Sequence, residues 1–233
     1  MTHRHALIIG AGSGLSAALA RRFAREGLSV SLAARDAGKL AGLAAETGAE
    51  AHACDAADRA QIAALFARLD AGRGAPDVLV YNPSGRAPGP FAEVDGAEME
   101  RAVAVTAFGA FHAAQEAVKR MRPQGRGALL FTGASAGVKG YPRSAAFAMG
   151  KFALRGLCQS LARELHPQGI HVGHVVIDGG VRNPTRPDHR EPADKPDSML
   201  DPDAIAETYW RLLEQPRSAW AWEIALRPWV EPF

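Results

Sequence analysis

The chain has 233 residues, of which 47% are hydrophobic, enough to bury one sizeable core in a single α/β domain. Its 27 basic and 25 acidic residues are interspersed and give a formal charge of +2, so neither a nucleic-acid-binding nor an anionic-membrane surface is indicated. The two cysteines, Cys54 and Cys158, lie in apolar runs, which predicts buried reduced thiols and excludes a disulfide framework.

The N-terminal run could pass for a secretory signal, because Arg4 precedes an apolar stretch and small residues follow as far as Ala20. Glycine and serine interrupt that run, however, and cleavage there would remove a strand and the turn after it. No other segment is apolar for long enough to span a bilayer. We therefore expect a soluble, cytoplasmic protein with no membrane partner.

Short apolar runs alternate with helical patterns along the chain. The runs predict strands at Ala6–Ile9, Val30–Ala33, Ala49–Ala53, Val78–Tyr81, Ala128–Thr132, Val172–Ile177 and Glu223–Leu226. The patterns between them predict helices at Leu15–Glu26, Ala37–Glu46, Arg59–Leu69, Ala97–Met121, Ser144–His166 and Asp203–Glu214. Apolar strands separated by helices indicate a Rossmann-type, doubly wound α/β fold, in which helices cover both faces of a seven-stranded parallel sheet. No repeat or linker divides residues 1–233, which predicts a single domain.

One irregular stretch, residues 182–200, follows the sixth predicted strand and contains Pro184 and three further prolines. A long structureless loop inside a compact domain is usually functional or disordered, and this one lies where a substrate lid would be. His189, within it, can reach a substrate, although a solvated loop histidine is the commoner case. The other histidines show no metal-ligand spacing, so no metal site is predicted.

A glycine-rich turn, residues 10–16, joins the first predicted strand to the first helix. In doubly wound sheets ligands bind outside the carboxyl ends of the strands. Gly10 permits a tight turn, and Gly12 and Gly14 let backbone N–H groups approach a pyrophosphate at the positive end of the helix. The turn therefore predicts a dinucleotide site formed by Gly10, Gly12, Ser13, Gly14 and Leu15.

The residues after the next three strands bear on the kind of dinucleotide. Ala34 cannot bind a ribose diol, whereas Arg35 can pair with a 2′-phosphate, which favours NADP(H) over NAD(H); the alternative is a solvated arginine. Asp55 can accept a hydrogen bond from the adenine amino group or cap a helix. Asn82 can hold the chain beside the adenosine ribose or cap a turn.

Over nearly the whole chain these motifs resemble those of the short-chain dehydrogenase/reductase superfamily. The glycine turn is similar to its Gly-x-x-x-Gly-x-Gly motif, with Ser16 in the last position, and Asp55 matches its adenine-site aspartate. Residues 82–85 resemble its Asn-Asn-Ala-Gly motif. Asp178-Gly179 falls where a Pro-Gly pair usually follows the sixth strand, which implies that backbone near Val181 faces the nicotinamide carboxamide. The resemblance also implies a homodimer or homotetramer.

The active-site positions depart from that family, which uses a Tyr-x-x-x-Lys pair, a serine thirteen residues before the tyrosine, and an asparagine on the preceding helix. Phe147 and Lys151 occupy the pair, one turn apart on one helix face. Ala134 occupies the serine position. Thr106 occupies the asparagine position, where we expect it to bond to its own helix backbone. Only the lysine, which in the family holds the nicotinamide ribose, is retained.

Four residues are candidates to replace the missing groups. Lys151 can act as the acid if burial lowers its pKa. Ser135 lies one residue out of register and would need a bulge to reach a substrate carbonyl. Tyr141 is otherwise a surface or interface aromatic, and Ser144 a helix N-cap. Lys151 with Ser135 is the favoured pair.

These observations predict an NADP(H)-dependent oxidoreductase that transfers a hydride to a small carbonyl or imine-type substrate with a non-standard proton donor. The alternative is a non-catalytic NADP(H)-binding sensor or partner subunit, and an assembly role without cofactor is the third possibility. The aromatic C-terminus can be core or a subunit contact; it comprises Trp220, Trp222 and the segment from Trp229 to Phe233.

Overall fold

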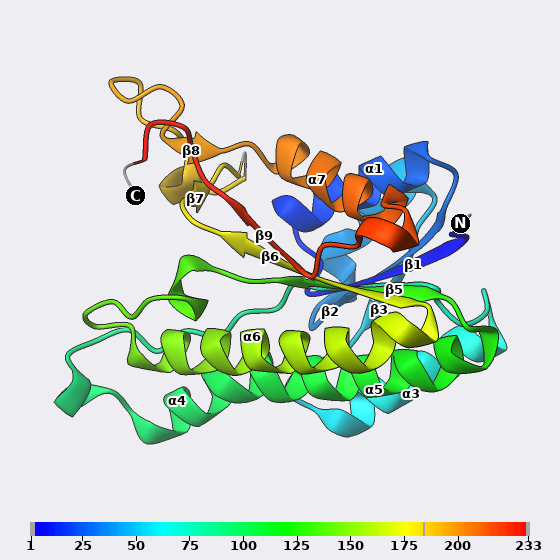
Figure 1. Cartoon of the computed structure of the whole chain (residues 1–233). Helices are drawn as coiled ribbons and strands as arrows, with labels where there is room; N and C mark the ends of the chain where they lie inside the picture. The colour runs from blue at the N-terminus through cyan, green and yellow to red at the C-terminus, as the bar shows by residue number, and fades with distance from the viewer. Residues whose placement is uncertain (1–2, 184, 232–233) are drawn as a thin grey trace.

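Most strands of the computed structural model form one parallel sheet with helices on both faces (Figure 1). The structure describes residues 3–183 and 185–231, so Pro184 of the predicted lid and Phe233 of the aromatic C-terminus lie outside the described residues. Within those ranges the sheet has the predicted number of strands, seven, and their order is β3-β2-β1-β4-β5-β6-β9. The strands are β1 (His5–Ile9), β2 (Ser29–Ala34), β3 (Glu50–Ala53), β4 (Val78–Tyr81), β5 (Gly127–Thr132), β6 (Ile170–Ile177) and β9 (Glu223–Leu226).

Two helical layers enclose the sheet (Figure 1). The layer above it in that view contains α1 (Leu15–Arg25) and α7 (Pro202–Glu214), which pack on each other. The layer below it contains α3 (Arg59–Ala71), α4 (Gly96–Val103), α5 (Gly109–Met121) and α6 (Ala145–Leu165). The predicted helix from Ala37 begins as a 3-10 turn, η1 (Ala37–Leu40), and continues as α2 (Ala41–Thr47). Further short turns are η2 (Phe91–Glu93), η4 (Arg122–Gln124), η5 (Ser135–Gly137), η6 (His166–Gln168) and η8 (Arg217–Ala219).

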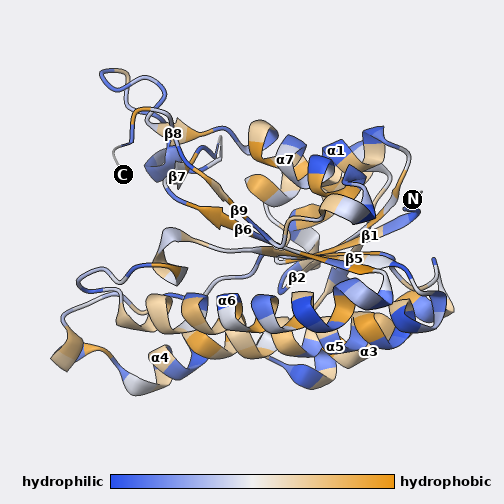
Figure 2. Ribbon diagram, viewed as in Figure 1, coloured by the Kyte–Doolittle hydropathy of each residue, from blue (hydrophilic) through white to orange (hydrophobic). Residues whose placement is uncertain are grey.

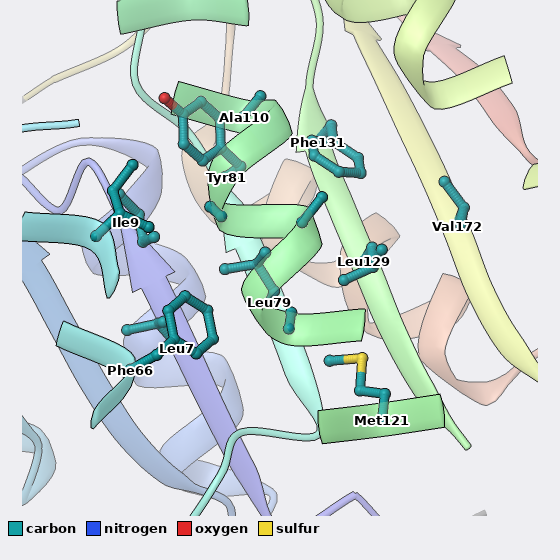
Figure 3. Close-up of a cluster of buried hydrophobic side chains, with 14 of the residues drawn as sticks. Leu7, Ile9, Phe66, Leu79, Tyr81, Ala110, Met121, Leu129, Phe131 and Val172 are labelled. Carbon is teal, nitrogen blue, oxygen red and sulfur yellow. The ribbon is translucent and has the colours of Figure 1, made fainter. Parts of the chain in front are cut away.

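The alternation of side chains along the strands explains why the central strands are mainly apolar on both faces. Leu7 and Ile9 of β1 point into the core below the sheet, whereas Ala6 and Ile8 enter the core above it. Figure 3 shows part of the lower core, where Phe66 of α3 lies against these strands. Figure 2 shows the strands to be mainly hydrophobic, while the helices carry hydrophilic residues as well. Both cysteines are free and buried in the lower core, as predicted.

The predicted helix Ala97–Met121 is interrupted by a π-helical turn, η3 (Ala104–Phe108), where the Gly109 N–H donates to the carbonyl of Ala104. Thr106 lies in this turn, is fully buried, and accepts a hydrogen bond from Gly85 N at 2.9 Å through Oγ1. The prediction that Thr106 bonds to its own helix was therefore wrong. The widened turn instead directs its hydroxyl to the loop after β4, a tertiary contact that helical periodicity does not encode.

The predicted lid at 182–200 contains more regular structure than expected. It includes η7 (Pro187–His189) and ends in β8 (Met199–Leu200), which pairs in parallel with β7 (Gly180–Val181). Arg182 at its start pairs with Asp201 at its end at 2.6 Å. The expectation of a structureless loop was wrong in this respect, because the two ends of the segment bond to each other.

The C-terminal aromatic residues differ in how far they are buried. Trp220 stacks on His171 with ring centroids 4.6 Å apart, and Trp222 packs against the lower core. Trp229, in contrast, is 82% exposed. Across residues 3–183 and 185–231, no helix is both long and apolar enough to cross a membrane.

Candidate active site

The glycine turn lies at the carboxyl end of β1, beside the point where the strand order reverses between β1 and β4. Gly10 has φ +81°, and a Cβ there would lie 2.6 Å from Pro83 N, so only glycine fits. Gly14 is the N-cap of α1, and no side chain caps this helix. Gly12 has open space where a Cβ would be. An uncapped, positively polarised helix end beside open space suits the pyrophosphate of a dinucleotide.

Ser16, in the third glycine position of the family motif, stabilises the glycine turn. Its hydroxyl donates to the Gly10 carbonyl at 3.0 Å and accepts from Asn82 Nδ2 at 2.7 Å. Asn82 therefore ties the end of β4 to the glycine turn. A serine in this position thus holds the turn closed through two hydrogen bonds of one hydroxyl.

A cleft of about 920 Å³ opens in front of the turn, and the predicted cofactor residues Gly10, Gly12, Ser13, Arg35 and Asp55 all line it. The remaining predicted cofactor residues line the adjoining cavity instead: Leu15, Asn82, Lys151, Gly179 and Val181. Gly14 lies between Ser13 and Leu15 at the start of α1. The structure thus brings the predicted cofactor residues together along one edge of the sheet.

The charges in the cleft differ in how far they are already paired. Asp55 accepts from Arg101 at 2.8 Å and from Ala57 N at 2.9 Å, and the Arg101 guanidinium is the main cause that lowers the pKa of this carboxyl. The cap of α3 is Asp58, so Asp55 is not the helix cap. Arg35 is exposed and forms no ion pair with any described residue. Its guanidinium is available to a ligand phosphate.

The second cavity, of about 530 Å³, adjoins the cleft, since Ser84 and Arg86 line both. All four catalytic candidates line it: Lys151, Ser135, Tyr141 and Ser144. Phe147 and Ala134, at two of the three altered family positions, line it as well, whereas Thr106 does not. His189 of the lid also lines it, with Nδ1 3.0 Å from the Val181 carbonyl oxygen. One chamber therefore holds every group proposed to handle the substrate.

Lys151 is the buried cation of this chamber, with only 2% of its surface exposed. Its Nζ donates to the Thr132 carbonyl at 2.7 Å. Burial, with a smaller effect of the Arg86 charge, lowers the pKa of the amine to about 7. A lysine in this range exchanges a proton readily near neutral pH.

The hydroxyl candidates differ in their surroundings. Ser144 occupies the N-cap position of α6, yet its side chain makes no capping bond and so remains available to the cavity. Ser135 begins the turn η5 directly after Ala134. Tyr141 is 40% exposed, and Lys139 Nζ lies 5.6 Å from its ring centroid.

Sequence reasoning missed two features of the site. The first is Arg86, whose guanidinium carbon lies 4.0 Å from the Phe147 ring centroid. Its position directly after the Asn82–Gly85 motif, at the carboxyl end of β4, was the signal that could have identified it. The second is the contact of the lid with the glycine turn, where the Ser13 hydroxyl bonds to Thr185 Oγ1 at 2.5 Å and to Asn183 Oδ1 at 3.2 Å.

Comparison with known proteins agrees with this geometry. A family model described as short chain dehydrogenase matches residues 4–193. The cyclic-di-GMP-binding biofilm dispersal mediator protein of Escherichia coli (strain K12) is 32% identical over 189 residues, which are 80% of this chain and 76% of that protein. A crystallised short-chain dehydrogenase from Rhodopseudomonas palustris aligns with a TM-score of 0.83 at 32% identity, covering 98% of this chain and 100% of its own. A metagenomic short-chain oxidoreductase in complex with NADP aligns with a TM-score of 0.84 at 28% identity, covering 98% of each chain.

Proposed function

The chain belongs to the short-chain dehydrogenase family of oxidoreductases, and on that premise we propose that it is an NADP(H)-dependent reductase of a small carbonyl or imine-type substrate, with Lys151 as proton donor. The observation that carries the proposal is the junction of the two cavities at Ser84 and Arg86. A dinucleotide bound on the glycine turn would extend through that junction toward the buried lysine.

The protein's part in the reaction is to hold the reactants and to move one proton. NADPH, when bound, supplies the hydride to the carbonyl carbon of the substrate. Lys151 Nζ gives a proton to the oxygen and is reprotonated from solvent, so that an alcohol and NADP⁺ are formed. The Thr132 carbonyl fixes the position of the amine, and Ser135, Tyr141 and Ser144 offer hydroxyl donors to the developing oxyanion. An iminium substrate carries its own proton and depends less on the missing tyrosine.

NADP(H) preference is supported by the unpaired Arg35 at the end of β2. We expect the native protein to bind NADPH more tightly than NADH, and Arg35→Ala to lose roughly ten- to hundred-fold in NADPH affinity with little change for NADH. Fluorescence titration of both cofactors measures this. Arg101→Ala, which removes an arginine paired with Asp55 in the same cleft, is the matched control and should affect both cofactors alike. Equal affinities of the native protein would exclude the assignment.

A non-catalytic, NADP(H)-binding sensor or partner subunit is the second candidate. It is favoured by one observation: Phe147 and Ala134 line the chamber at the positions where the family has its tyrosine and serine. The two candidates share the cofactor and differ only in turnover.

We further propose that the protein is a homodimer or homotetramer that associates through α5 and α6. Phe108 and Phe111, three residues apart, are 61% and 47% exposed, and Met149 and Phe152 on α6 are 52% and 46% exposed. Phe108 and Met149 line one shallow groove, which brings one member of each pair together, and exposed apolar side chains of this kind are what interfaces bury. Light scattering should give a multiple of 24.7 kDa, and Phe108→Asp with Phe152→Asp should give the monomer mass. A native mass of one chain would refute the proposal.

A further inference from the structure

Arg86 is held in place by the backbone before it. Gly85 N donates to Thr106 Oγ1 at 2.9 Å, and a Cβ on Gly85 would lie 2.4 Å from the Cα of Ala102. The loop after β4 is therefore pressed against the end of α4, where only a glycine fits. The side chain of Arg86 extends from this fixed segment of backbone, and its guanidinium lies over the ring of Phe147. An arginine anchored at its backbone and stacked at its head group loses little further freedom when it binds a ligand.

The donors of this guanidinium are not engaged by the protein. Within residues 3–183 and 185–231, its side chain forms neither an ion pair nor a hydrogen bond, and its guanidinium carbon lies 4.0 Å from the centroid of the Phe147 ring. Arg101, which lines the same cleft, is instead paired with Asp55. The N–H groups of a stacked guanidinium lie in the plane of the guanidinium itself, parallel to the ring face. They form the fork that matches a carboxylate.

The charges around the chamber favour an anion. Arg86 and Lys151 both line it, and the positive charge of Arg86 acts on the buried amine. Of the two carboxylates that also line it, Asp178 is paired with Arg227 at 3.0 Å, while Glu231 comes from the end of the described chain. Two cations in one partly enclosed cavity repel each other, and a ligand anion between them relieves that repulsion.

We propose that Arg86 binds a carboxylate of the substrate, which makes the substrate a small oxo acid or the corresponding imino acid. The inference rests on the proposed reductase function and specifies its substrate class. Phe147 then has a positive role, because its ring supports the guanidinium on one face. The carboxylate lies at Arg86, and the carbonyl is left for the Lys151 amine.

The test compares acids with their uncharged esters on protein saturated with NADP⁺, so that binding is measured without turnover. Pyruvate, 2-oxobutyrate and benzoylformate, each beside its methyl ester, are titrated by calorimetry. We expect each acid to bind at least about tenfold more tightly than its ester, and this preference to vanish in Arg86→Ala. Arg86→Lys keeps the charge without the fork and should retain part of it. Arg163→Ala, which removes an exposed arginine that lines neither cavity, is the matched control and should retain all of it.

Three outcomes decide the question. Equal binding of acids and esters by the native protein would overturn the proposal. A loss of NADPH affinity in Arg86→Ala as large as its loss of acid affinity would also overturn it, because Arg86 would then serve the cofactor. Arg86-dependent binding of acids without reduction of any of them would support the carboxylate site and refute the reductase function, so the two claims can fail separately.

Discussion

Replacing Lys151 by methionine is expected to lower kcat for reduction by roughly 10²- to 10⁴-fold, the range typical of a lost general acid. Methionine fills similar volume without the buried amine, so the melting temperature should stay the same or rise while activity falls. We expect a large change in kcat and a smaller change in KM, because the proposed substrate contacts with Arg86 and with the hydroxyl groups remain in the variant. Single-turnover kinetics with NADPH and thermal unfolding measure the two effects.

The pH dependence gives the same prediction a second readout. Burial lowers the pKa of Lys151 to about 7, and the amine donates a proton only in its charged form, which is populated below that value. The rate of reduction by the native protein should therefore fall as pH rises through about 7, and the reverse oxidation should rise over the same interval. Lys151→Arg keeps the charge but cannot release the proton, so it should be as slow as Lys151→Met. A native-like rate or pH profile in either variant would exclude the amine as donor.

The double variant Phe147→Tyr with Ala134→Ser is expected to gain roughly 10²- to 10³-fold in carbonyl reduction, because it restores a proton donor and an oxyanion donor to the chamber. Both positions line the chamber, and the tyrosine introduced at position 147 would lie one helical turn from Lys151. The measurement is NADPH consumption over a panel of carbonyl and imine substrates, with each single variant as control.

The result also separates the two candidate functions. Turnover by the native protein supports the reductase, with Lys151 and the hydroxyl residues as the next positions to mutate. Activity in the double variant alone supports the sensor or partner subunit, because fold and cofactor site would then be competent while the native chemistry is absent. No gain from restoring the two hydroxyls would contradict the assignment of Phe147 and Ala134 to those positions.

The fold could be predicted from the sequence because the central strands β1, β4 and β5 are buried and mainly apolar on both faces and are bounded by turn residues. The side chains from Ala6 to Ile9 alternate between the two cores, so the apolar composition of this strand predicts that both of its faces are buried. The break at Ala104–Phe108 could not be predicted in this way. Thr106 in this turn is hydrogen-bonded to Gly85. The two residues are twenty-one positions apart, so the helical periodicity of the sequence does not reveal the contact.

The candidate site divides along similar lines. Some site residues could be identified from their residue type and from their position relative to a predicted strand or helix. Gly10, Arg35 and Lys151 are of this kind, and all three line the two cavities. Arg86 belongs to no motif, and its significance arises only when Phe147, on a different element, is found beneath it. The bonds of the lid to Ser13 are likewise tertiary contacts between segments far apart in the chain.

Those lid bonds have a thermodynamic consequence. Ser13 lines the cofactor cleft, and its hydroxyl is also the anchor of Asn183 and Thr185, so one side chain takes part in both equilibria. If occupancy of the cleft changes the bonds that Ser13 makes to the lid, linkage requires the position of the lid to change the affinity of the cleft by the same factor. A substrate that holds the lid against Ser13 would then change the affinity for the nucleotide, and its departure would reverse that change. The glycine turn and a segment 170 residues later would in that case be coupled through the Ser13 side chain.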